Sequence, residues 1–148
     1  MIEGASGWMV GRTHHFPLRV YYADTDAGGV VYHATYLAFA ERARTEMLRL
    51  AGRDQIQLLK DHGLVFAVRN LEADYRRPAR LDDLLCIRSH VSHVGGASLH
   101  VSQSIWRGDE ELVGLAIRLV CMRLDGRAVR IPAEMRHELQ DFLSEKAD

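Results

Sequence analysis

The chain has 148 residues, 47% hydrophobic and 26% charged, with a formal net charge of −1 at neutral pH. This composition is typical of one globular domain and excludes intrinsic disorder. The small net charge predicts no attraction to nucleic acid, and no apolar run reaches the roughly 20 residues that would insert into a membrane. Cys86 and Cys121 lie in apolar runs without a disulfide framework, and no signal peptide is recognisable, so we expect a cytoplasmic protein.

The first part of the chain is predicted to be an arm followed by a strand. Glycines punctuate residues 1–14, which we expect to form a flexible N-terminal arm before a single domain over residues 15–148. Apolar side chains alternate with polar ones over residues 18–22, which predicts the first strand. A turn-rich segment over residues 24–29 comes next.

The strongest helix signal covers residues 36–51. Apolar residues recur there at three- and four-residue spacing, and charged residues occupy the opposite face. Gly52 is suited to end this helix. A second, short helix is predicted from Asp54 as its N-cap to just before Gly63.

The remainder of the chain alternates with a period of two, which predicts strands joined by short turns. A change of register near Asn70 indicates a β-bulge, and Pro132 is placed to begin a last helix. The strands are expected over residues 64–75, 84–94, 98–105 and 112–123. Without crossover helices between them, the fold is α+β, a five-stranded antiparallel sheet wrapped around a long central helix.

The segment between the first strand and the long helix carries chemistry. It contains two carboxylates, Asp24 and Asp26, and two glycines, Gly28 and Gly29. Glycines let a ligand approach the backbone closely, and a helix start presents unpaired N–H groups with a partial positive charge. A carboxylate beside such amides is the combination that acyl transfer requires, because the amides stabilise the developing oxyanion.

The run from Asp24 to His33, DTDAGGVVYH, resembles the signature of hotdog-fold thioesterases related to 4-hydroxybenzoyl-CoA thioesterase. It looks closest to the acyl-CoA thioesterase branch associated with the Tol-Pal cell-envelope cluster. Further matches lie at residues 41–48, 75–80 and 95–99, and the resemblance covers roughly residues 16–140. It implies the hotdog fold and hydrolysis of a short-chain or aromatic acyl-CoA to a carboxylic acid and free coenzyme A. It also implies a homo-oligomer, either a dimer or a dimer of dimers, that needs no cofactor.

The resemblance also assigns roles to individual residues. Asp26 would be the catalytic carboxylate, acting as nucleophile or as general base, while Asp24 is more typical of a turn residue. Amides near Tyr32 and His33 would polarise the thioester oxygen, and the His33 side chain would orient Asp26 or protonate the leaving thiolate. The residues implied in oxyanion or substrate binding are Gly28, Gly29, Val30 and Tyr32.

Two further sets of residues have a functional and a purely structural interpretation. Arginine suits phosphate recognition, yet surface arginines most often serve solubility. Candidates for contacts with the coenzyme A phosphates are Arg76, Arg77, Arg80 and Arg88. An apolar helical stripe either lines an acyl pocket or belongs to the core, and this applies to Tyr36, Phe39 and Met47.

Two other functions stay open from the sequence. One is a hotdog dehydratase acting on hydroxyacyl thioesters, and the other is a non-catalytic protein that binds acyl-CoA or acyl-carrier protein. No metal site is expected, since the histidines lack zinc spacing. His90 and His93, for example, are predicted to point to opposite faces of one strand because their separation is odd.

Overall fold

The computed structural model describes residues 2–52 and 55–141. Its centre is a six-stranded antiparallel sheet with the order β1-β2-β4-β5-β6-β3. The strands are β1 (Trp8–Val10), β2 (Thr13–Arg19), β3 (Leu64–Tyr75), β4 (Leu84–Val94), β5 (Ser98–Arg107) and β6 (Glu110–Arg123). β6 lies inside the sheet between β5 and β3, as its apolar sequence on both faces indicates.

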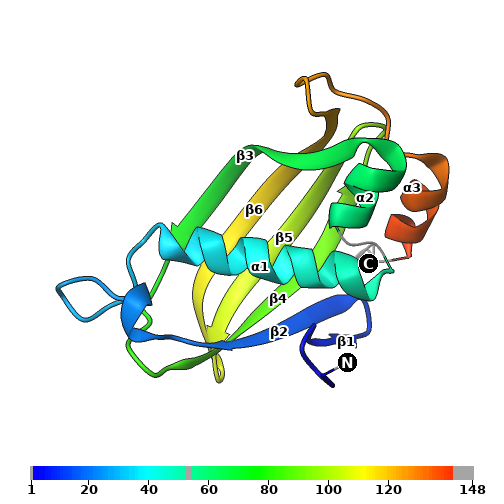
Figure 1. Ribbon diagram of the computed structural model, residues 1–148. Coiled ribbons are helices and arrows are strands. Elements are labelled where there is room, and N and C mark those ends of the chain that lie inside the picture. Colours follow the sequence, from blue (N-terminus) through cyan, green and yellow to red (C-terminus); the bar gives the residue numbers. More distant parts are fainter. Residues whose placement is uncertain (1, 53–54, 142–148) are drawn as a thin grey trace, which may run out of the picture.

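The long helix α1 (Thr35–Leu50) lies across one face of the sheet, and the core forms between them (Figure 1). Buried helix side chains such as Phe39, Ala43 and Met47 meet the inward faces of β4, β5 and β6. Two short helices, α2 (Gln55–His62) and α3 (Ala133–Gln140), lie near the C-terminal end of α1. The predicted α+β fold, an antiparallel sheet with a central helix, is confirmed.

The N-terminal region departs from the prediction in two ways. The sheet has six strands rather than five, because Trp8–Val10 forms a hairpin with the start of β2. The flexible arm expected over residues 1–14 was therefore wrong for its second half, where His14 is fully buried and its Nε2 lies 2.7 Å from the Ser6 carbonyl oxygen. Gly11 has a φ of +60°, so it permits the tight turn that pairs the two strands.

Two bulges interrupt the ladders. The one predicted near Asn70 is confirmed, since the β3–β6 register shifts between Val68 and Asn70. A second shift, between Val91 and His93 in β4, places His90 and His93 on the same outer face of the sheet. The expectation of opposite faces was wrong because a bulge inserts one extra residue, here Ser92, which shifts the alternation of side chains by one position.

Some predicted details lie outside the described residues. They are the N-cap role of Asp54 and the last part of the C-terminal apolar stripe, Phe142 and Leu143. Pro132 precedes α3 as its N-cap rather than forming its first turn.

A buried polar cluster fixes α1 against the sheet. Gln103 is 2% exposed, and its Oε1 accepts a hydrogen bond from Arg44 Nη1 at 3.0 Å. Its Nε2 donates to the Ala40 carbonyl and to Ser89 Oγ, both at 2.9 Å. Buried polar groups are costly unless they are hydrogen-bonded, so this one amide on β5 holds α1 in a fixed position against β4 and β5.

We predict that Gln103→Leu lowers the free energy of unfolding by about 2–4 kcal/mol, because it removes the side-chain partner of the buried Arg44 guanidinium and the bonds to the Ala40 carbonyl and Ser89 while nearly conserving volume. Urea unfolding of the variant measures this loss. The matched control is Ser102→Ala, on the outer face of the same strand, which should cost less than about 0.5 kcal/mol. Equal effects of the two substitutions would contradict the structural role assigned to the cluster.

Candidate active site

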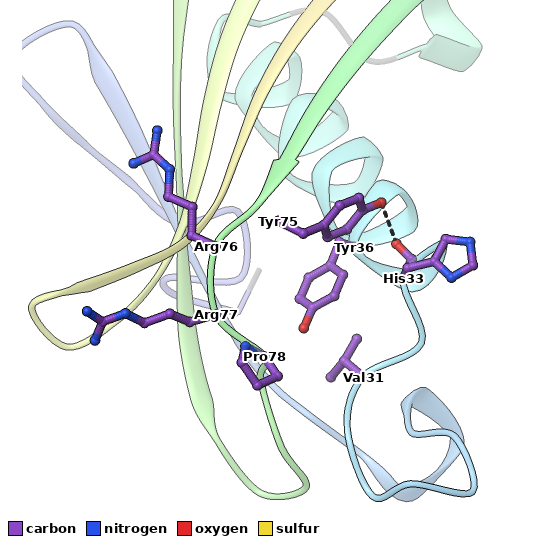
Figure 2. A pocket seen from close by; sticks show the side chains of 7 residues that line it. All are labelled: Val31, His33, Tyr36, Tyr75, Arg76, Arg77 and Pro78. Carbon is purple, nitrogen blue, oxygen red and sulfur yellow. Dashed lines mark hydrogen bonds between the residues drawn. The ribbon is translucent and has the colours of Figure 1, made fainter.

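A groove of about 280 Å³ opens beside the N-terminal end of α1. Its walls come from the segment before α1, from the first turn of α1, and from the end of β3 with the loop after it (Figure 2). The lining residues are Val31, His33, Tyr36, Tyr75, Arg76, Arg77 and Pro78. The groove therefore joins two segments, residues 31–36 and 75–78, that lie far apart in the sequence.

Backbone hydrogen bonds hold these two segments together. The Val31 N–H donates to the Ala79 carbonyl at 2.9 Å, and Val30 forms an isolated bridge with Arg80. From the other side, the Ala79 N–H donates to the Tyr36 hydroxyl at 2.9 Å. Ala79 is fully buried, so these bonds are shielded from water and set the distance between the groove walls.

Asp26 begins a tight turn on the segment that leads into α1, and it is not among the residues that line the groove. Its N–H donates to the Val30 carbonyl at 2.8 Å, and Gly29 closes the turn with a φ of +78°, which favours glycine. One carboxylate oxygen, Oδ1, accepts a hydrogen bond from the Gly28 N–H at 2.8 Å. Among the described residues no group binds Oδ2, and the side chain is exposed. The turn thus orients the carboxylate and leaves one oxygen free to react.

The last two residues before α1 present backbone N–H groups without an acceptor among the described residues. Tyr32 N–H is not one of them, because it donates to the Asp24 carbonyl at 3.1 Å. The N–H groups of Gly28 and Gly29 are also engaged, within the Asp26 turn. No side chain caps the helix at Ala34, and among the described residues nothing accepts from the N–H groups of His33 and Ala34. Such groups at a helix start attract negative charge.

Tyr75 fixes the peptide that carries these donors. Its hydroxyl donates to the His33 carbonyl at 2.8 Å, and its ring meets the Tyr36 ring edge-on at 5.6 Å. Tyr75 is not among the site residues predicted from the sequence, although it lies in the matching segment over residues 75–80. Its position at the end of a strand, directly before two arginines, is the signal that could have identified it.

Of the predicted site residues, the structure brings His33, Arg76 and Arg77 to the groove. Asp26 lies on the segment that carries Val31, one residue beyond the Thr25–Val31 bridge. Arg88 is elsewhere, because its guanidinium stacks on Trp106 at 4.1 Å on the outer face of the sheet. Of the apolar stripe on α1, Tyr36 lines the groove, whereas Phe39 and Met47 belong to the core.

Arg76 and Arg77 are paired with acidic side chains. Arg76 lies 3.0 Å from Asp74 and 2.8 Å from Glu111, and the hydrogen bond from Arg76 to Asp74 is the main cause of its raised pKa. Arg77 lies 2.8 Å from Glu110. Figure 2 shows both guanidinium groups pointing away from Tyr36 and Tyr75. Their acidic partners offset the charge of both guanidinium groups, which lie at the rim of the groove and not in its interior.

Two kinds of site are absent from the part of the chain that the structure describes. No three histidine, cysteine, aspartate or glutamate side chains there come together to hold a metal ion. Nor is any helix in residues 2–52 and 55–141 long and apolar enough to cross a membrane.

Comparison with known proteins assigns the family. The model of a family described as the thioesterase superfamily matches residues 28–114. This chain belongs to the thioesterase superfamily. The matched segment of this thioesterase runs from Gly28 to the middle of β6 and so includes every residue that lines the groove.

Individual relatives agree with this assignment. The chain is 46% identical over 122 residues to the acyl-CoA thioesterase YbgC of Haemophilus influenzae, a match covering 82% of this chain and 90% of the relative. It is 47% identical over 108 residues to the acyl-CoA thioester hydrolase YbgC of Escherichia coli O6:H1, covering 72% and 80%. A crystal structure of a probable thioesterase from Bartonella henselae superposes with a TM-score of 0.78 at 40% identity, covering 81% and 99%.

Arg107 braces the loop that forms one wall of the groove. Its Nη1 donates to Asp83 Oδ2 at 2.8 Å and to the Pro78 carbonyl at 3.2 Å, and Asp83 Oδ2 also accepts from the Arg80 N–H at 2.8 Å. Burial by itself raises the pKa of Asp83, but the hydrogen bonds from Arg80 and Arg107 outweigh it, and the pKa lies below its ordinary value. The folded protein therefore favours the ionised carboxylate.

We predict that Asp83→Asn lowers the free energy of unfolding at pH 7 by about 1–3 kcal/mol, because Arg107 loses a charged partner. A carboxyl whose pKa is lowered by folding stabilises the protein at pH values above its pKa in the unfolded chain, which is about 3.9. This contribution disappears as the pH falls through the pKa of the folded protein. The difference between wild type and variant should thus be full above pH 5 and shrink below pH 4. Denaturant unfolding at several pH values measures it, and a difference that is constant down to pH 3 would refute the account.

Proposed function

We propose that this thioesterase hydrolyses acyl-CoA to a carboxylic acid and free coenzyme A. The observation that carries the proposal is the Asp26 turn. It holds a carboxylate with one free oxygen on the same short segment as the two unspent amides of His33 and Ala34. Hydrolysis of a thioester needs this pair of features, an attacking or activating carboxylate and donors for the oxyanion. Two relatives of the same family, at 46% and 47% identity, are named for this activity.

In the proposed mechanism, the thioester carbonyl lies against the free N–H groups of His33 and Ala34. These donors stabilise the oxyanion that forms when the carbonyl carbon is attacked. Asp26 attacks that carbon itself, forming an acyl anhydride that water then hydrolyses, or it takes a proton from an attacking water. The thiolate of coenzyme A leaves and receives a proton, for which the His33 side chain is placed at the groove. Arg76 and Arg77 attract the phosphates to the rim.

We propose further that a second copy of this chain completes the site. β3 is an edge strand of 12 residues, and its outer edge presents unpaired backbone groups to solvent. The segment over residues 21–32, which carries Asp26, exposes three large aromatic side chains, which soluble proteins normally cover. They are Tyr21 (69% exposed), Tyr22 (82%) and Tyr32 (50%). Figure 1 shows the C-terminal end of β3 beside the N-terminal end of α1, so one partner can cover both features.

We predict that Asp26→Asn lowers kcat/KM by about 10²- to 10⁴-fold, the usual contribution of a general base, without changing stability, since an Asn oxygen still accepts from Gly28. Release of free thiol from short-chain and aromatic acyl-CoAs, and from acyl-carrier protein thioesters, measures the rate with a colour reagent. The matched control is Asp24→Asn, whose carboxylate accepts from the Tyr21 N–H at 2.8 Å within the preceding turn. This control should keep most activity.

Undiminished turnover of Asp26→Asn would refute the assignment of the carboxylate. A single turnover of the wild type in ¹⁸O-labelled water tests the nucleophilic route. Label in the Asp26 side chain shows an anhydride that water opened at the aspartyl carbonyl, whereas label in the product alone is compatible with both routes. An enoyl product without free thiol would show dehydration instead, and saturable binding without any product would show a binding protein.

For His33→Ala we predict a partial loss of kcat together with a changed pH dependence of kcat, because an ionisable group leaves the groove while Asp26 and the backbone donors remain. Rates of thiol release across pH 5 to 9 measure both effects. The control is His137→Ala, an exposed histidine on α3 away from the groove. A pH profile that matches the wild type would reduce His33 to a structural residue.

A further inference from the structure

In the part of the chain that the structure describes, the hydroxyl group of Tyr36 is used by the fold only as a hydrogen-bond acceptor. Its side chain is 3% exposed, yet it is one of the residues that line the groove. Figure 2 shows its hydroxyl pointing into the space between Val31 and Pro78, on the side away from the His33 ring. A phenylalanine would fill the same apolar space but would leave the buried Ala79 N–H without an acceptor, so the fold uses the hydroxyl oxygen and leaves its proton unassigned.

The hydrogen bonds of this hydroxyl are only half used. Its oxygen accepts from the Ala79 N–H, and among the described residues no group accepts its own proton. The hydroxyl of Tyr75, by contrast, is spent on the His33 carbonyl. A buried donor without an acceptor costs free energy, and accepting one hydrogen bond strengthens a hydroxyl as donor of another.

The groove supplies no acceptor for that proton among the side chains that line it. Val31 and Pro78 are apolar, the two arginines are donors that point away, and the Pro78 carbonyl already accepts from Arg107. Burial also raises the pKa of Tyr36, which keeps the phenol protonated at neutral pH. The proton is therefore available to solvent in the groove and to an acceptor on a molecule that displaces this solvent.

Resting on the proposed function, we propose that Tyr36 determines specificity by donating a hydrogen bond to an oxygen carried on the acyl group of the substrate. The thioester oxygen itself is assigned to the amides of His33 and Ala34, and the Tyr36 hydroxyl points to a different part of the groove. At about 280 Å³ the groove lies at the small end of ligand sites. The favoured substrates are thus short acyl-CoAs with an oxo or hydroxyl group a few bonds from the thioester.

Non-hydrolysable thioethers of coenzyme A test this without relying on turnover. S-(3-oxobutyl)-CoA and S-(4-oxopentyl)-CoA each carry one acyl-like oxygen, and S-butyl-CoA and S-pentyl-CoA are their matched partners without it. We expect one oxo compound to bind wild type about five- to tenfold more tightly than its partner, the ratio that corresponds to one neutral hydrogen bond. Calorimetry measures the dissociation constants.

Two variants separate a specific contact from a structural one. Tyr36→Phe also removes the contact with Ala79, so all four compounds can change in affinity together, but the ratio within each pair should fall to about one. Tyr75→Phe, which changes the other tyrosine of the groove, should weaken all four compounds alike and keep the preference. If Tyr36→Phe does not fold, the preference of the wild type decides alone.

Equal affinity of wild type for both members of each pair would overturn the role of Tyr36, as would a preference that persists in Tyr36→Phe. Hydrolysis of acyl-CoA with no such preference leaves the proposed function standing and removes this inference only. Failure to bind any of the thioethers, together with no thiol release from any acyl-CoA, would overturn both.

Discussion

The site depends on the two peptide groups of Ala79. Its carbonyl accepts from Val31 and its N–H donates to the Tyr36 hydroxyl, so one fully buried residue joins the segment before α1, the first turn of α1 and the loop after β3. Alanine is small enough for the three segments to approach this closely. Without that junction, the groove walls would be surface loops with no fixed separation.

Around this junction the chain uses its polar groups unevenly. Most donors in the loop segments are spent on the fold, as in the Asp26 turn and the Tyr75 contact with His33. The donors without an acceptor among the described residues include the N–H groups of His33 and Ala34 and the Tyr36 hydroxyl, which lie at the start of α1. Preorganised donors cost no reorganisation when charge develops, which is why such positions carry the chemistry and the recognition proposed for this thioesterase.

The elements with a strong period could be predicted from the sequence, and those set by tertiary contacts could not. The helix over residues 36–51 and the bulge near Asn70 are local patterns, and both are confirmed. The pairing of β1 with β2 is a contact between two short glycine-flanked pieces, and the bulge at Ser92 leaves no mark in the alternation before it. For the site, the DTDAGGVVYH run predicted Asp26 and His33, and the structure places His33 at the groove, whereas Tyr75, more than 40 residues away, meets His33 through the fold alone.

The helix α1 is attached to its surroundings at two separated points, by Tyr36 at its first turn and by Arg44 with Gln103 at its middle. Residues on a helix advance by about 100° each, so sliding the helix by a single position would swing both side chains away from their partners at once. These two contacts therefore hold the helix against both rotation and translation. Changes in the substrates that fit the groove must then arise in the flanking loops, whose length and conformation can vary while α1 keeps its position.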